Sequence, residues 1–188
     1  AESCIVTTPY ENLHILPSSL DLAAAELEIS DKKGRESILK NALLPIKQYY
    51  DYIIIDCPPS LGLITTNALT ASDTFLVPIQ CEYYALEGLT QLMSTVRRIK
   101  RQYNNTIDIE GVLLTMYDGR LNLTQQVVEE VKKFFPRKVF KTVIPRGVRL
   151  SEAPSFGMPV IYYDKNCKGS ITYTELAKEI IAKERSYE

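Results

Sequence analysis

The sequence predicts an α/β fold with a mainly parallel β-sheet flanked by helices on both faces. Short runs rich in β-branched residues alternate along the chain with longer stretches in which apolar residues recur every three or four positions. The short runs are continuously apolar, which is typical of strands that are covered on both faces. This alternation favours right-handed crossovers and parallel pairing, and because no low-complexity linker divides the chain we expect one domain over residues 1–188.

The amino-terminal third is predicted to hold one short strand, two helices and then the most apolar strand. A strand is expected over Leu13–Leu16, and a helix of good helix formers follows from Leu20. A second helix is expected over residues 36–50, where Pro45 should bend or break it. The chain then enters the run Ile53–Ile55, which we expect to form a buried strand of the parallel sheet.

Strand and helix keep alternating over the rest of the chain. Amphipathic patterns predict helices, and short apolar runs predict strands. The expected elements are a helix over 61–73, a strand over 74–80, a helix over 85–103, a strand over 109–116, a helix over 123–135, a strand over 139–144, a short turn-rich segment, and a final helix over 172–183.

Asp56 directly follows the run Ile53–Ile55. In open α/β sheets ligands collect outside the carboxyl ends of the strands, so a carboxylate at this position is well placed to hold a cation and its waters. Pro58 and Pro59 then stop the strand, since proline has no amide donor. An apolar strand that ends in Asp is the Walker B pattern of nucleotide-binding proteins, although acids also commonly close strands without binding metal.

Composition excludes several classes of protein. The formal net charge is −1, so any contact with DNA must come from a local patch. Four scattered cysteines form no CxxC pair and are accompanied by a single histidine, which argues against a structural zinc site or a disulfide framework and favours reduced thiols. No apolar run approaches the roughly 18 residues that span a bilayer.

A phosphate-binding loop of the form GxxxxGK[ST] is absent from the 188 residues. The eight glycines include no pair with this spacing followed by lysine. If Asp56 serves a nucleotide site, we therefore expect the loop to precede Ala1 in a longer chain.

Four motifs in order resemble the ParA/Soj family of chromosome and plasmid partition ATPases, which has a P-loop NTPase-like fold. They are YDYIIIDCPPSLGLITTNALTASD, VPIQCEYYALEGL, EGVLLTMYDGRLNL and VIPRGVRLSEAPSFGMPVI. The resemblance covers most of the chain, from about residue 11 to 182. It implies that residues 1–188 are the carboxyl-terminal part, about three-quarters, of a ParA-type ATPase domain that is incomplete at its amino terminus.

The resemblance implies a nucleotide site that binds ATP and Mg²⁺. Asp56 corresponds to the Walker B acid, held near Mg²⁺ through water and needed for catalysis, and Pro58 lies in the segment that responds to the γ-phosphate. Met116, Pro145 and Arg146 fall where the family forms its adenine pocket. For Met116, ordinary packing at a strand end remains an equally good interpretation.

Arg120 and Arg149 match the family positions that contact DNA without sequence preference. Both are expected in loops and without a convincing acidic partner, and solvated surface charge is the alternative interpretation for each. A nearby basic run could extend such a surface but is more often a polar helix end; its members are Lys132, Lys133, Arg137, Lys138 and Lys141.

The function implied is ATP-dependent partitioning of DNA. By the resemblance, the intact protein is an ATPase that dimerises with ATP, binds non-specific DNA, is stimulated by a ParB-type centromere-binding partner, and is cytoplasmic and nucleoid-associated. The 188 residues alone are expected to be inactive. Two alternatives stay open: a MinD-like membrane-associated regulator of cell division, which the mixed charges of ELAKEIIAKERSYE disfavour, and a non-catalytic regulatory fragment.

Overall fold

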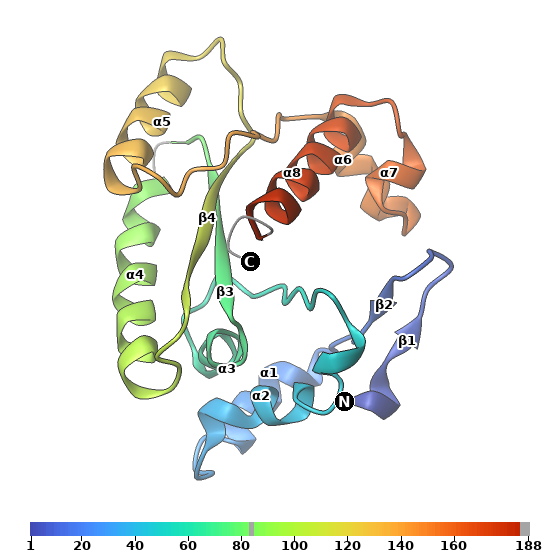
Figure 1. The fold of residues 1–188 in the computed structure, drawn as a ribbon, viewed down its shortest axis with the longest axis vertical. Helices are drawn as coiled ribbons and strands as arrows, with labels where there is room; N and C mark the ends of the chain where they lie inside the picture. Colours follow the sequence, from blue (N-terminus) through green and yellow to red (C-terminus); the bar gives the residue numbers. More distant parts are fainter. Residues whose placement is uncertain (83–84, 185–188) are drawn as a thin grey trace. The chain divides into compact units, whose positions relative to one another are not determined.

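The computed structural model describes residues 1–82 and 85–184, and the chain divides into two compact units. Unit 1 comprises Ala1–Thr74 and Leu92–Asp108, and unit 2 comprises Phe75–Gln91 and Ile109–Glu188. The long helix α4 (Ala85–Gln102) begins in unit 2 and ends in unit 1. Each unit is described by itself below, with the elements labelled in Figure 1.

Unit 1 begins with a small hairpin and continues with short helices. Strands β1 (Val6–Thr7) and β2 (His14–Ile15) pair antiparallel, with Val6 opposite Ile15. The helical elements that follow are α1 (Asp21–Glu28), a 3₁₀ turn at Arg35–Ser37, α2 (Ile38–Leu43), a 3₁₀ turn at Lys47–Tyr49 and α3 (Leu63–Ala71).

Two asparagines hold α3 in unit 1. The Asn67 side chain accepts a hydrogen bond from the Leu39 amide (3.1 Å) and donates one to the Arg35 carbonyl (2.7 Å), which ties α3 to α2. The buried Asn104 side chain donates to the carbonyls of Leu69 (3.0 Å) and Ser72 (2.7 Å). These carbonyls at the end of α3 lack helical partners, so Asn104 satisfies groups that would otherwise be buried unpaired.

Unit 2 is built on two adjacent strands, β3 (Thr74–Gln80) and β4 (Asp108–Thr115), which α4 connects. Their arrows run in the same direction in Figure 1, as expected for a strand–helix–strand crossover. The later elements are α5 (Asn122–Phe134), α6 (Val148–Glu152), a 3₁₀ turn at Ala153–Phe156, α7 (Val160–Tyr163) and α8 (Lys168–Glu184).

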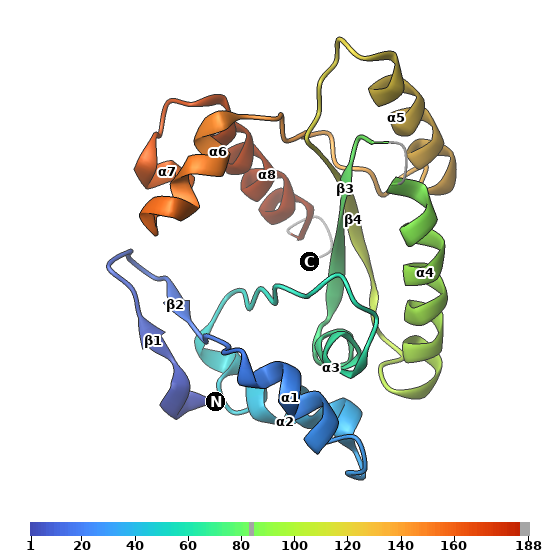
Figure 2. The ribbon, with the colours of Figure 1, turned by 180° about the vertical axis from the view of Figure 1, so that it is seen from behind.

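Helices lie on both faces of the β3–β4 pair. In Figure 1 and in the reverse view of Figure 2, α5 lies to one side of the strands and α8 to the other. The core on one face contains Leu113 of β4 and Leu176 of α8, with Phe140, Ile144, Leu76, Leu150 and Ile180. Gly111 is needed here because a β-carbon at this position would meet the Phe140 ring.

The predicted α/β class and most of the predicted elements are confirmed. Strand β3 has the predicted bounds, α4 ends one residue earlier than predicted, and α5 begins and ends one residue earlier than predicted. Helix α2 ends at Leu43, before Pro45. The final helix begins earlier than predicted, at Lys168, and the segment expected to be turn-rich contains α6 and α7.

The predicted strand Ile53–Ile55 is wrong for this structure. Residues 52–56 form no β-ladder with the described residues, and Ile53 and Ile54 are exposed, Ile54 to 91%. A strand requires a neighbour for its amides and carbonyls, and β-propensity does not supply one. The run therefore has the composition of a buried strand without its pairing.

The predicted strand over 139–144 is interrupted, although the segment follows β4. Val139 bridges Val112 in parallel, and the Ile144 amide donates to the Leu114 carbonyl at 2.9 Å. Between these points the amides of Lys141 and Thr142 donate to the Glu179 carboxylate of α8, at 2.7 and 2.9 Å. The side chain of Glu179 thus replaces β4 as acceptor and breaks the ladder.

The first predicted strand is shorter than expected. Only His14 and Ile15 of the predicted Leu13–Leu16 are in β2, and they pair antiparallel with β1 instead of joining a parallel sheet.

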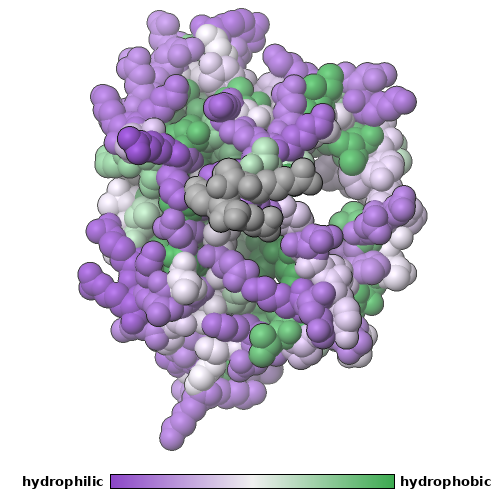
Figure 3. Space-filling view, in the orientation of Figure 1, coloured by the Kyte–Doolittle hydropathy of each residue, from purple (hydrophilic) through white to green (hydrophobic). Residues whose placement is uncertain are grey.

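Within the described ranges, no helix has the length and apolarity that crossing a bilayer requires. The face shown in Figure 3 is mainly hydrophilic, with hydrophobic residues in separate patches.

Candidate functional site

Met116 and Pro145 lie together where β4 ends in unit 2. Met116 directly follows β4 with a positive φ of 51°, and its side chain is 42% exposed. The next residue, Tyr117, donates its amide to the Ile144 carbonyl (3.0 Å) and bridges Pro145 in parallel. The left-handed conformation is uncommon for methionine, and here it turns the chain at the edge where strand ends collect ligands.

Arg146 follows Pro145 and forms an ion pair at the same edge. Its Nη2 lies 2.8 Å from Oε1 of Glu82, the second residue after β3, and both side chains are more than half exposed. Glu82 was not among the predicted site residues. Its place just after a predicted strand, like that of Asp56, was the signal that could have found it.

Asp118 is a second acid that was not predicted, and it holds Arg120. Arg120 donates to the Asp118 carboxylate through Nε (2.9 Å), Nη2 (2.6 Å) and its backbone amide (3.1 Å). These bonds lower the pKa of Asp118 to about 2, with a smaller contribution from the charge of Arg146. Arg120 is in a turn as predicted, but the expectation that no acid pairs with it is wrong, because Asp118 lies two residues away.

Arg149 also has acidic partners, and it lies in α6 instead of the predicted loop. Its Nη1 is 2.8 Å from Oε2 of Glu152, one helical turn on, and its Nε is 3.5 Å from Oδ2 of Asp164. The Tyr163 hydroxyl donates to Glu152 at 3.1 Å. Hydrogen bonding to Glu152 raises the pKa of Arg149, and the same contact lowers the pKa of Glu152.

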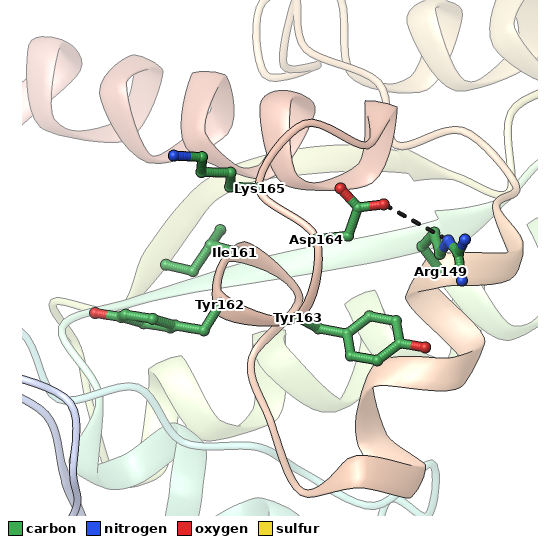
Figure 4. Close-up of a pocket in the computed structure, with 6 residues that line it drawn as sticks. All are labelled: Arg149, Ile161, Tyr162, Tyr163, Asp164 and Lys165. Atoms are coloured by element: carbon green, nitrogen blue, oxygen red, sulfur yellow. Dashed lines mark ion pairs between the residues drawn. The ribbon is translucent and has the colours of Figure 1, made fainter.

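An open pocket lies beside Arg149. Figure 4 shows the Asp164 carboxylate pointing toward the guanidinium, and the remaining lining comes from residues 161–163 of α7 and from Lys165. Arg149 is about half exposed, so its guanidinium reaches solvent while two carboxylates hold it. A phosphate that bound here would compete with those carboxylates for the same donors.

Asp56 and Pro58 belong to unit 1 and lie outside its helices and strands. Asp56 is exposed, and it forms no hydrogen bond or ion pair with another described residue. Mg²⁺ at phosphate sites is commonly held by one or two carboxylates together with waters and substrate phosphates. A single exposed carboxylate with unused acceptor oxygens fits that form of binding.

The structure thus brings some predicted site residues together. Met116, Pro145 and Arg146 share one edge of unit 2, and Arg120 joins them through Asp118, whose pKa responds to both arginines. Arg149 lies in the next helix, with its own acidic partners. Asp56 and Pro58 stand in the other unit.

Comparison with known proteins shows the family to which the chain belongs. A family model described as an AAA domain matches residues 1–109. The sporulation initiation inhibitor protein Soj of Bacillus subtilis is 60% identical over 178 residues, which cover 95% of this chain and 70% of that protein. The chain belongs to the Soj/ParA family of chromosome-partitioning ATPases.

A second Soj protein supports membership of the Soj/ParA family, and an enzyme of another name shares the fold. The chromosome-partitioning ATPase Soj of Treponema pallidum is 49% identical, over 97% of this chain and 72% of that protein. Among solved structures, a cobyrinic acid a,c-diamide synthase from Mycobacterium smegmatis with bound ADP and magnesium is 33% identical and superposes with a TM-score of 0.84, over 100% of this chain and 69% of that one.

Proposed function

We propose that this chain acts in DNA partitioning as part of an ATPase that uses ATP and Mg²⁺. The observation that carries the proposal is the 60% identity to Soj of Bacillus subtilis over nearly the whole chain. The diamide synthase is similar at only 33% identity, which favours partitioning over amide synthesis as the function. The chain spans 70% of the length of Soj, and we propose that it forms the carboxyl-terminal part of the ATPase domain.

Asp56 is the residue that would hold Mg²⁺, through water, and Pro58 would lie in the segment next to the γ-phosphate. The support is chemical: Asp56 is exposed and its oxygens have no other partner among the described residues. When bound, Mg²⁺ neutralises charge on the phosphates during phosphoryl transfer. Replacing Asp56 by a neutral residue should therefore affect hydrolysis more than it affects the fold.

Met116, Pro145 and Arg146 would contact the adenine base. Their support is their common position at the carboxyl end of β4, with a half-exposed thioether beside a rigid proline. Glu82 forms an ion pair with the Arg146 guanidinium at the same edge. An apolar platform with a few fixed polar groups is the usual form of a site for a planar ligand.

Arg120 and Arg149 would contact DNA phosphates, and two subunits joined by ATP would double these contacts. Each guanidinium is already ordered by a carboxylate, and each remains exposed, Arg120 to 88%. Phosphate contacts add along a duplex, so dimerisation with ATP couples to DNA affinity. A ParB-type partner would then act by stimulating hydrolysis, and the protein would be a cytoplasmic, nucleoid-associated one.

DNA binding is tested with the substitution Arg149→Glu. The protein used is the full product of its gene, including any residues that flank this chain. Charge reversal should weaken ATP-dependent binding to a non-specific duplex and reduce the slope of log Kobs against log salt concentration by about 0.9 for each phosphate that the protein no longer neutralises. The readout is fluorescence anisotropy across a series of salt concentrations, with ATP binding measured by calorimetry as a separate check.

Glu152→Gln is the matched control, because it changes the partner of Arg149 and keeps the guanidinium. It should leave DNA affinity unchanged or raise it. An Arg149→Glu variant with wild-type affinity and slope would remove Arg149 from the DNA surface.

A further inference from the structure

One face of α4 carries a cluster of arginines that the nucleotide site and the two DNA-contacting arginines leave unexplained. Arg97, Arg98 and Arg101, with Ser94 and Gln102, line an open depression in unit 1. All five side chains are exposed. We call this the α4 arginine patch.

The α4 arginine patch lies opposite the buried side of the helix. At about 100° per residue, the patch spans one side of α4, while Ile99 and Val96 lie on the other and are almost fully buried. Packing therefore gives no reason for arginine at these positions. The attraction of cations to a helix C-terminus accounts only for the last turn, which contains Arg101, whereas Arg97 and Arg98 lie in the turn before it.

The patch differs from most other described arginines in having no acidic partner, a property that it shares with Arg137. Arg35, Arg120, Arg146 and Arg149 each pair with a carboxylate. None of the three patch arginines forms an ion pair with another described residue, and Arg97 donates only to the carbonyl of Met93 in its own helix. From Gly88 to Ile107 the sequence contains no Asp or Glu, although the whole chain has a formal net charge of −1.

The chemistry of the patch matches consecutive phosphates. Guanidinium groups bind phosphate oxygens in bidentate fashion, and serine and glutamine side chains are common phosphate donors in DNA complexes. Positions 97 and 101 are one turn apart, so two guanidinium groups project from adjacent turns on one side. The lining contains no apolar side chain to enter a membrane surface, so a lipid bilayer fits less well than a nucleic-acid backbone.

We propose that the α4 arginine patch contacts the phosphate backbone of DNA, as a second surface in addition to Arg120 and Arg149. The inference rests on the proposed DNA-binding function and deepens it. Because the patch and those two arginines belong to different units, the two surfaces can be removed one at a time.

The test compares two variants that lose the same charge. Arg97→Gln/Arg101→Gln removes two patch cations, and Arg35→Gln/Lys47→Gln removes two cations of unit 1 that are paired with Glu36 and Asp73. With ATP and a non-specific duplex, the patch variant should lower the salt slope by about 1.8, and the paired-cation variant should not change it. Arg97→Lys/Arg101→Lys should restore most of the slope, since the charge returns.

The outcomes separate this inference from the proposed function. A slope that falls only in the patch variant supports the second surface. An unchanged slope in the patch variant, with a reduced slope in Arg149→Glu, overturns the patch and leaves the proposed function intact. If the patch variant loses binding to phosphatidylserine vesicles but keeps its DNA binding, the DNA assignment of the patch is overturned in favour of a membrane. A wild-type protein that binds no DNA overturns both proposals.

Discussion

At the scale of single residues, three arginines of unit 2 pair with acids, some of them close in sequence and others far along the chain. Asp118 binds Arg120 through three hydrogen bonds and responds to the charge of Arg146, while Glu152 and Asp164 hold Arg149. Each arginine keeps exposed surface. The acids therefore orient the guanidinium groups, and they also compete with any phosphate that binds to those groups.

Asp118 should titrate well below the ordinary aspartate pKa of 3.8, at about 2. A carboxyl whose pKa is depressed in the folded protein stabilises the fold above its unfolded pKa, and this stabilisation is lost as pH falls from about 3.8 to about 2. An NMR titration of the Asp118 carboxyl carbon checks the value, and Arg120→Gln should return the midpoint toward 3.8. A wild-type midpoint near 3.8 would mean that the pair does not form in solution.

At the scale of elements, a carboxylate of α8 shapes the segment beside β4. Burial raises the pKa of Glu179, but the hydrogen bonds from the amides of Lys141 and Thr142 outweigh it and lower the pKa. Because these two amides turn to α8, the segment meets β4 only near Val139 and Ile144, ahead of the Pro145–Arg146 site. Glu179 thus helps to position that site from a distance.

Glu179→Gln should destabilise the protein by about 1 kcal/mol, since one of the two backbone donors loses a charged acceptor. Chemical denaturation at neutral pH measures the change in the free energy of unfolding. Glu175→Gln is the matched control, because it removes the same charge from an exposed position of α8 and should change stability little. Equal effects of the two substitutions would show that the backbone contact contributes nothing.

The sequence predicts an element well where the pattern that defines it is local. It predicts an element less well where pairing with a segment distant in the sequence determines whether the element forms. Amphipathic spacing located α4 and α5 to within about a residue, and Pro45 ended a helix as expected. Ile53–Ile55 has strand composition but pairs with no strand of the described residues, and the ladder over 139–144 is broken by Glu179, which lies far along the chain. Periodicity cannot report either contact. Asp118 and Glu152 lie within three residues of the arginines that they pair with and were discernible in the sequence, whereas Asp164 lies far along the chain from Arg149.

At the scale of the whole molecule, charge is distributed in a way that the net value of −1 conceals. Unit 1 presents arginines on α4 without acidic partners among the described residues, and unit 2 presents arginines that carboxylates hold. The α4 arginines can bind a polyanion without breaking an ion pair. The arginines of unit 2 must first release their carboxylate partners. Under the proposed function, both kinds of arginine would contact DNA phosphates.

The central claim is that Asp56 serves ATP hydrolysis, and the most direct test is the rate of ATP turnover by Asp56→Asn, in the protein with any flanking residues of its gene. Removing the carboxylate should lower kcat by about 10²-fold or more, while the fold is preserved because Asp56 is exposed. Asp51→Asn, an exposed acid five residues earlier, should keep wild-type turnover. An Asp56→Asn protein that hydrolyses ATP as fast as the wild type would contradict the claim.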